Sequence, residues 1–383
     1  MAWGRDVRSE WRLDPDFLTV NHGSFGAAPV CVRAVQDAWR EQMEAQPTRF
    51  MSQLPGLLRA AADPLGAFLG ANGRDIVFTD NATTGCNAVL RSLALQPGDE
   101  ILMLTHVYGA VRNTVRFVTE RAGATMTEAA VPFPALSDDG VVAAVAAALT
   151  PRTRLAVIDH IASHSALVLP VARIVAVCHA AGVPVLIDGA HAPGQIDVDL
   201  TAIGADFYTG NCHKWLCAPK GSAFLWVAPS QQAALHPTVI SHGLGGGFLA
   251  EFDWTGTRDP SAALSVPAAL DFHQRLGGSA LRARNIALAA EGAASIARRL
   301  QTETVPTGSA MGLVRLPWDG KPLDLRARLL AAGTDAPVHA IGGANWLRIS
   351  AFAYNELDDF VRLADLVARV IRENDNSRGI ATS

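Results

Sequence analysis

The segment VPVLID at residues 183–188 constrains the fold more than any other part of the sequence. Five consecutive apolar residues lead to Asp188, and a turn of small residues follows. An uninterrupted apolar run is typical of a strand buried on both faces, as in a parallel sheet covered by helices. Open α/β sheets bind ligands at the carboxyl ends of such strands. The segment therefore predicts an α/β protein in which Asp188 faces a binding crevice.

A lysine follows Asp188 at a distance that allows both to reach one crevice. The step from Asp188 to Lys214 is 26 residues, enough for a short helix or loop and one more strand, ADFYTG. A buried lysine loses its proton readily, and the neutral amine can form a Schiff base with an aldehyde. Pyridoxal phosphate is such an aldehyde, and an acid that keeps its ring nitrogen protonated makes the ring an electron sink. The pair predicts a pyridoxal-phosphate site.

Strand-like and helix-like segments alternate through the first two thirds of the chain. Apolar runs predict strands at 75–79, 99–108, 125–130, 154–159, 183–187, 205–210 and 222–228. Apolar residues at helical spacing predict helices at 31–46, 53–69, 82–95, 109–123, 137–149 and 169–182, with Pro47 and Pro55 as breaks. Strands that alternate with helices imply right-handed crossovers and a mostly parallel sheet.

The last third of the sequence follows a different pattern. Residues 241–260 are rich in glycine and predict a long loop. Helices at 261–276 and 279–301, then strands at 311–316 and 346–350 with a helix between them, predict a smaller α+β domain. We therefore expect a large domain with the N-terminal segment at 1–260, and a small C-terminal domain at 261–383 to which the N-terminal segment contributes. Residues 374–383 are expected to be disordered.

Composition excludes several classes of function. The formal charge is −4 and the sequence pI is about 6.3, which gives no basic field for nucleic acid. No apolar run approaches the roughly 20 residues of a membrane span, and the N-terminus lacks the apolar core of a signal peptide, so we expect a cytoplasmic protein. Five cysteines without CxxC spacing indicate reduced thiols and no zinc site.

Six motifs together carry a resemblance to a known family, although each alone is weak. They are NHGSFG at 21–26, NATTG at 81–85, DGAHAPG at 188–194, NCHKWLCAPKGSAFL at 211–225, GTRDP at 256–260 and LRISAFAYN at 347–355. In this order they resemble the class V aminotransferase superfamily of fold-type I pyridoxal-phosphate enzymes, and within it the isopenicillin N epimerase-like branch. The resemblance implies a mainly parallel seven-stranded sheet with helices on both faces, an antiparallel strand after the lysine, and a homodimer with shared active sites.

The resemblance assigns roles around the cofactor ring. Lys214 corresponds to the lysine that forms the Schiff base, and Asp188 to the acid that pairs with the ring nitrogen. His191 matches the residue that contacts the ring hydroxyl or the Schiff-base region. Ser163 lies where the superfamily often places a contact to that hydroxyl, with His164 as the alternative.

A second group of residues is expected to hold the cofactor phosphate. Ala82 and Thr83 begin a helix, where backbone N–H groups and a hydroxyl suit a dianion. The resemblance adds Asn211 and His213, which precede the lysine. It also implies that Thr257 reaches the phosphate from the neighbouring subunit. Taken alone, Thr83 reads equally well as a helix-capping residue.

The remaining candidates stack on the ring or bind the substrate. Tyr108, on the loop after a strand, is the expected stacking residue, and His106 is its alternative. Arg348 in WLRIS matches the family arginine that binds the substrate α-carboxylate, a task that suits a planar guanidinium. Asn21 and His22 are expected to line the same pocket.

These residues predict an enzyme that removes the α-proton of an amino acid or its derivative, but they leave the outcome open. We expect an isopenicillin N epimerase-like reaction, with a C–S (β-elimination) lyase or a class V aminotransferase as alternatives. The branch commonly has a histidine where Phe352 stands, so acid/base chemistry at that position is not expected. No cysteine follows Cys217, which argues against the desulfurase mechanism. The intact set of Asp188, His191, His213 and Lys214 argues against a cofactor-free binding protein. The lack of a GxGxxG turn after an early strand argues against a nicotinamide-dependent dehydrogenase.

Overall fold

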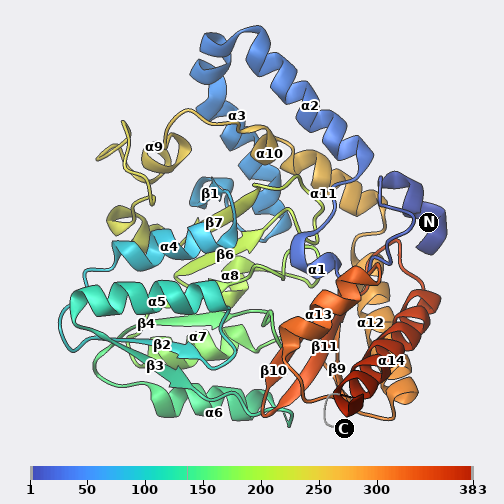
Figure 1. The fold of residues 1–383 in the computed structure, drawn as a ribbon. Coiled ribbons are helices and arrows are strands. Elements are labelled where there is room, and N and C mark those ends of the chain that lie inside the picture. The colour runs from blue at the N-terminus through green and yellow to red at the C-terminus, as the bar shows by residue number, and fades with distance from the viewer. Residues whose placement is uncertain (1–2, 136, 381–383) are drawn as a thin grey trace. The chain divides into compact units, whose positions relative to one another are not determined.

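The computed structural model describes residues 3–135 and 137–380 and divides them into two compact units. The large unit comprises residues 26–163 and 169–275, and the small unit comprises 3–25, 164–168 and 276–380. Figure 1 shows the chain coloured along its length. Each unit has its own sheet and is described by itself.

The large unit contains a seven-stranded sheet in the order β1-β7-β6-β5-β4-β2-β3. All neighbouring pairs are parallel except those of β7, which runs antiparallel to both β1 and β6. This confirms the predicted fold class and the antiparallel strand after the lysine. The strands are β1 (Ile76–Thr79), β2 (Glu100–Leu104), β3 (Thr125–Ala129), β4 (Thr153–Asp159), β5 (Val185–Asp188), β6 (Phe207–Asn211) and β7 (Ala223–Val227).

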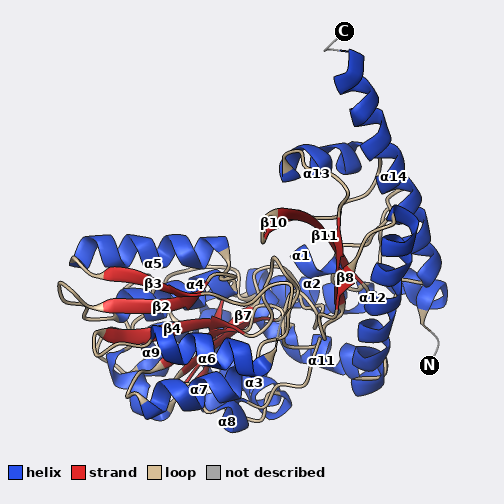
Figure 2. Cartoon of the chain, turned by 90° about the horizontal axis from the view of Figure 1, so that it is seen from below, coloured by secondary structure: helices blue, strands red, loops and turns tan. Residues whose placement is uncertain are grey.

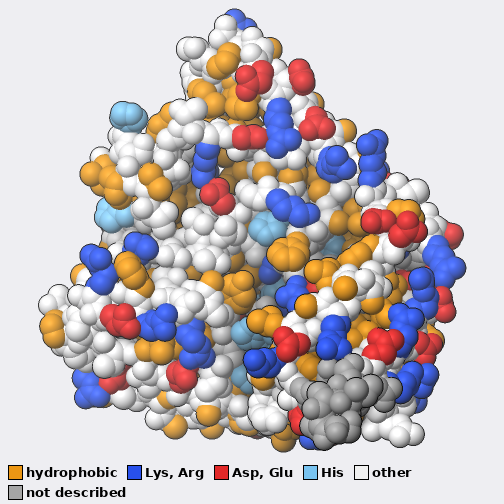
Figure 3. Space-filling view, in the orientation of Figure 1, with side chains coloured by type: hydrophobic (Ala, Val, Ile, Leu, Met, Phe, Trp, Pro, Cys, Tyr) orange, Lys and Arg blue, Asp and Glu red, His pale blue; other side chains and the backbone are white. Residues whose placement is uncertain are grey.

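Helices cover both faces of this sheet, as Figure 2 shows around β2, β3 and β4. Strands β2, β5, β6 and β7 are buried at every position, which is why their sequences lack polar alternation. The helices after β1 are α4 (Ala82–Ser92), α5 (Gly109–Ala122), α6 (Asp138–Ala148), α7 (Val171–Ala180) and α8 (Leu200–Ile203). On the face shown in Figure 3, cationic and anionic side chains are interspersed.

Two long helices precede the sheet, and one differs from the prediction. Helix α2 spans Val30–Ala45, and α3 spans Pro47–Phe68 where the sequence predicted a start at residue 53. Pro47 occupies the first turn, where the missing N–H costs nothing, but Pro55 lies inside the helix. Buried apolar side chains along one face of α3 outweigh the hydrogen bond that Pro55 removes.

Two further predictions about the large unit need correction. Helix α9 (Phe248–Asp253) forms within the glycine-rich loop, because Phe248 and Phe252 pack together and join the apolar core of this unit. Helices α10 (Ser261–Leu264) and α11 (Val266–Arg275) contact α2 and α3, so residues 261–275 lie in the large unit and not beyond the boundary expected after residue 260.

The small unit is built on a four-stranded antiparallel sheet in the order β10-β11-β9-β8. The strands are β8 (Thr304–Val305), β9 (Met311–Arg315), β10 (Val338–Ile341) and β11 (Ala344–Ser350). The helices are η1 (Gly4–Glu10), α1 (His22–Phe25), α12 (Ser279–Leu300), α13 (Pro322–Ala331) and α14 (Leu357–Ile380). The sequence-based prediction missed β8, β10 and α14. Residues 374–380, predicted to be disordered, continue α14, while 381–383 lie outside the described residues.

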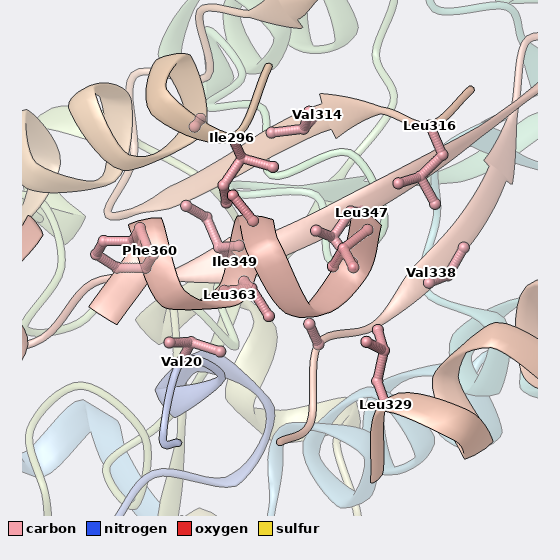
Figure 4. Close-up of a cluster of buried hydrophobic side chains, with 14 of the residues drawn as sticks. Val20, Ile296, Val314, Leu316, Leu329, Val338, Leu347, Ile349, Phe360 and Leu363 are labelled. Atoms are coloured by element: carbon pink, nitrogen blue, oxygen red, sulfur yellow. The ribbon is translucent and has the colours of Figure 1, made fainter. Parts of the chain in front are cut away.

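The two faces of this smaller sheet differ in polarity. Leu347 and Ile349 of β11 pack with side chains of α12 and α14, including Ile296 and Phe360, in a buried cluster (Figure 4). Side chains alternate along a strand, so Trp346, Arg348 and Ser350 point to the opposite face. The N-terminal segment joins this unit, since the Ser350 amide donates to the Val20 carbonyl at 2.7 Å. Across residues 3–135 and 137–380, no helix is long and apolar enough to cross a membrane.

Candidate active site

Lys214 lies in a turn directly after β6 in the large unit, next to a buried histidine. Its Nζ is 3.1 Å from Nε2 of His191, and the His191 side chain is buried. The Trp215 indole N–H points at Nδ1 of His191 across 3.5 Å. Because an indole nitrogen only donates, Nδ1 of His191 accepts in this contact, and Nε2 is the ring nitrogen that faces the lysine. The histidine therefore positions the Lys214 amine within hydrogen-bonding distance of its Nε2.

Two motif glycines close onto this turn. A Cβ on Gly194 would lie 2.8 Å from the carbonyl carbon and oxygen of Trp215, and the residue has φ +82. A Cβ on Gly26 would overlap the carbonyl oxygen of His213, at φ +67. Only glycine combines this conformation with this close approach of backbone. The final glycines of NHGSFG and DGAHAPG thus fix the segment that carries Lys214.

Asp188 has a second buried carboxylate beside it. Asp159 ends β4 and is paired in register with Asp188 at the end of β5, so both side chains project from the same face of neighbouring strands about 4.8 Å apart. Both residues are buried, and Oδ1 of Asp188 accepts a hydrogen bond from the Ala190 amide at 3.0 Å. Oδ2 of Asp159 is buried without a hydrogen-bond partner among the described residues.

Burial and mutual repulsion determine the charge of this pair. Burial raises the pKa of Asp188, whereas the Ala190 amide and the charge of Lys214 lower it. Burial, followed by the charge of Asp188, raises the pKa of Asp159 well above its usual value. Asp188 is therefore the member that carries the negative charge. The sequence analysis missed Asp159, although the signal was present, since LAVID and VPVLID are both apolar runs that end in aspartate.

The N-terminus of α4 only partly matches the predicted phosphate site. The side chain of Asn81 accepts from the Thr84 amide at 2.9 Å and caps the helix. The Ala82 amide donates to Oδ1 of Asn211 at 2.9 Å, so this predicted donor is engaged. The amide and hydroxyl of Thr83 make no hydrogen bond with another described residue. Thr83 is thus the donor at this helix end that can serve an anion.

His213 is oriented by the backbone beside the same turn. Its Nδ1 is 2.9 Å from the Ser222 carbonyl, which only accepts, so Nδ1 carries a proton. Burial lowers the pKa of His213 to about 4, which the Ser222 carbonyl opposes and the charges of Lys214 and Lys220 reinforce. The neutral ring leaves Nε2 as an acceptor. Contact with a phosphate oxygen therefore requires a second proton on His213.

The other predicted cofactor residues of the large unit occupy different environments. Tyr108 precedes α5 and is 40% exposed, whereas His106 is buried against the ring of Phe133 at a centroid distance of 5.5 Å. Ser163 is half-buried in the loop after β4, and Thr257 is exposed. An exposed Thr257 is compatible with the contact to a neighbouring subunit that the sequence analysis expects.

The small unit brings Arg348 together with Asn21. Nη2 of Arg348 donates to Oδ1 of Asn21 at 3.2 Å and to Oγ of Ser24 at 2.9 Å. Nδ2 of Asn21 donates to Asp335 at 2.7 Å, and Asp335 also pairs with Arg326 at 2.7 Å. The N-terminal motif and the WLRIS motif, far apart in sequence, therefore form one polar network within this unit.

His22 is packed inside the small unit. Its ring stacks on Phe352 at a centroid distance of 3.7 Å, and its Nδ1 is 2.9 Å from the hydroxyl of Tyr354. These contacts fix the orientation of the histidine. Its role in substrate binding stays a prediction.

The donor set of the large unit fits pyridoxal phosphate. A buried carboxylate is costly unless a cation or donor lies against it, and a protonated ring nitrogen would supply one for Asp188. Lys214 offers an amine 3.1 Å from Nε2 of His191, and Thr83 offers two donors at the positive end of an eleven-residue helix.

Comparisons with known proteins agree with this chemistry. A family model for aminotransferase class V matches residues 29–343. A putative L-cysteine desulfhydrase of Oryza sativa subsp. japonica is 41% identical over 286 residues, which cover 70% of this chain and 59% of that protein. The isopenicillin N epimerase of Streptomyces clavuligerus is 32% identical, covering 94% and 96% of the two chains. A solved cystine C–S lyase, in complex with cysteine persulfide, has a TM-score of 0.80 at 23% identity, covering 93% and 98% of the two chains, which shows a shared fold.

Proposed function

Because the chain belongs to the class V aminotransferase family, we propose that it removes the α-proton from an amino acid or an amino-acid derivative. It is an enzyme of this family, and its cofactor is pyridoxal 5'-phosphate. The observation that carries the proposal is the 3.1 Å approach of Lys214 to His191 next to the buried acid Asp188.

Each site residue of the large unit has a separate proposed role. When bound, pyridoxal phosphate supplies an electrophilic carbon for the substrate amine and an electron sink for the pair released at Cα. Lys214, whose half-buried Nζ lies 3.1 Å from Nε2 of His191, takes the α-proton and later returns one. Asp188 holds a proton at the ring nitrogen through its negative charge. Thr83 binds the phosphate, with Asn211 anchoring the start of α4 and His213 contributing after it takes up a proton.

Tyr108 is the residue that we propose to stack on the cofactor ring, since its side chain is exposed while His106 is buried against Phe133. Ser163 is proposed to contact the ring hydroxyl. In the small unit, Arg348 binds the substrate α-carboxylate, oriented by Asn21. The hydrogen bonds from Nη2 of Arg348 to Asn21 and Ser24 orient the guanidinium, whose planar shape and charge suit a carboxylate.

We favour β-elimination from an S-substituted cysteine as the outcome. In this reaction one base removes the α-proton, the C–S bond breaks, and water then releases pyruvate and ammonia along with the thiol. Epimerisation needs in addition a proton donor on the opposite face of Cα, and Phe352 stands where the resembled branch commonly has a histidine. The 41% identity with a putative L-cysteine desulfhydrase supports the same choice. Epimerisation is the second candidate, supported by the likeness to isopenicillin N epimerases.

The test is to incubate the holoenzyme with L-cysteine, S-substituted cysteines and other L-amino acids in deuterated water. Pyruvate, ammonia and free thiol in equal amounts would support β-elimination. Recovery of the amino acid with deuterium at Cα and inverted chirality would establish epimerisation instead. An oxo acid formed only with an acceptor would establish transamination. If Lys214→Ala turned over as fast as the unchanged protein, the proposed function itself would fail.

We also propose that the protein is a homodimer in which Thr257 of the partner subunit reaches the cofactor phosphate. The support is the exposure of Thr257 and the family to which the chain belongs. A cytoplasmic location stays a prediction from the sequence.

A further inference from the structure

The polar face of the small sheet carries a histidine that the sequence analysis did not single out. His339 of β10 is paired directly with Trp346 of β11, and Arg348 lies two residues further along β11. Side chains two residues apart point to the same face, so His339 and Arg348 are diagonal neighbours across the strand pair, with Cα atoms about 7–8 Å apart. That distance lets one small ligand group touch both side chains.

The ring of His339 has an unused polar atom. Its Nε2 is buried and has no hydrogen-bond partner among the described residues. The ring lies 4.7 Å from the ring of His164, at an interplanar angle of 48°, and His164 belongs to the short segment that joins this unit. A buried polar atom without a partner is unfavourable, and such atoms in native proteins call for an explanation. A ligand atom that pairs with Nε2 would remove the cost.

The charges around His339 indicate the kind of ligand. Arg326 and Arg348 carry two positive charges, and Asp335, which pairs with Arg326, carries one negative charge. The net charge of these three side chains is +1. Burial first, and then the charges of Arg348, His164 and Arg326, lower the pKa of His339 to about 2, so the ring is neutral and offers one N–H. A cationic guanidinium beside a neutral N–H donor suits an anion with two oxygens.

We propose that His339 is a second binding residue for the substrate carboxylate, in which Arg348 supplies the charge and the first hydrogen bonds and Nε2–H of His339 binds the other oxygen. The proposal rests on the proposed function, since it assumes an amino-acid substrate. It adds that recognition of the carboxylate requires β10 as well as the WLRIS strand. The ring of His164 lies against the ring of His339 at a centroid distance of 4.7 Å and limits its movement.

The experiment compares two ligands that differ only in the carboxylate. 2-Aminoisobutyrate and isopropylamine both offer an amine to the holoenzyme, neither can be eliminated, and only the first carries a carboxylate. Their dissociation constants are measured from the change in the visible absorbance of the cofactor. His339→Met and His339→Gln form the matched pair of variants, because the two side chains have similar length and only glutamine keeps an N–H donor.

We expect His339→Met to raise the dissociation constant of 2-aminoisobutyrate about tenfold or more, since a hydrogen bond to a charged group is lost. The dissociation constant of isopropylamine should stay unchanged. His339→Gln should recover most of that loss. Equal affinities for 2-aminoisobutyrate in all three proteins, or equal weakening of both ligands, would overturn the role of His339. If the unchanged protein binds no pyridoxal phosphate or responds to neither amine, the proposed function fails instead. Thermal midpoints and cofactor absorbance of the free variants check that the fold is intact.

Discussion

Replacing Gly194 with alanine should loosen the turn that carries Lys214. Alanine at φ +82 costs about 1–2 kcal/mol because its Cβ crowds its own backbone. The new Cβ would also lie 2.8 to 2.9 Å from backbone atoms of Trp215 and Leu216, which cannot swing away as a side chain could. Overpacking of this kind costs about 1–3 kcal/mol. The free energy of unfolding should therefore fall by roughly 2–5 kcal/mol, a drop in Tm of about 5 to 15 °C for a unit of this size.

Gly182 provides the matched control. It follows α7 in the same unit, has φ +73, and a Cβ there would meet no heavy atom within 4 Å. Gly182→Ala should cost about 1–2 kcal/mol through the backbone alone and leave the site untouched. The assay is thermal denaturation of each apoprotein, followed by titration with pyridoxal phosphate. Gly194→Ala should bind the cofactor more weakly than both other proteins. Equal Tm losses in the two variants, with equal cofactor affinity, would refute the steric argument.

Three further predictions concern the acids and the assembly. Asp188→Asn should keep most of the cofactor absorbance but reduce turnover by orders of magnitude, and near-normal kcat would contradict its pairing with the ring nitrogen. The pKa of Asp159 is raised in the folded state, which keeps this proton at pH values where the unfolded chain, with an ordinary pKa near 3.8, has lost it. The free energy of unfolding therefore falls as pH rises above about 3.8. Asp159→Asn removes this loss, so its Tm relative to the unchanged protein should increase from pH 5 to pH 7, and a constant difference would count against the raised pKa. Mixing inactive Lys214→Ala chains with inactive Thr257→Arg chains should restore part of the activity through hybrid dimers, and no recovery in proven hybrids would place the phosphate contact within one chain.

Sequence reasoning worked best where chemistry and strand position coincide. Asp188 ends an apolar run that forms the buried strand β5, and Lys214 follows the next strand, β6, so their places at these strand ends could be predicted from the sequence. The same pattern at LAVID marks Asp159, but its significance depends on the register of β4 against β5, which spacing along the chain does not reveal.

Other features depend on contacts between distant segments. The sequence around His339 shows no distinctive motif, and its relation to Arg348 appears only when β10 and β11 pair. The Ala82 amide was expected to be open, yet Asn211, far along the chain, occupies it. Helix α9 forms in a glycine-rich stretch because two phenylalanines reach an apolar core contributed by other elements. Pairing and packing of this kind override local composition.

The central claim is that Lys214 carries the cofactor, and borohydride reduction tests it most directly. The chain has three lysines, Lys214, Lys220 and Lys321, so peptide mass mapping after reduction can assign a pyridoxyl group without ambiguity. Lys220 serves as an internal control, because its Nζ donates to the Gly26 carbonyl at 2.8 Å in the same unit. We predict one pyridoxyl group per chain, on Lys214, and none in Lys214→Ala. A label on Lys220 or Lys321, or no label in protein saturated with pyridoxal phosphate, would contradict the account.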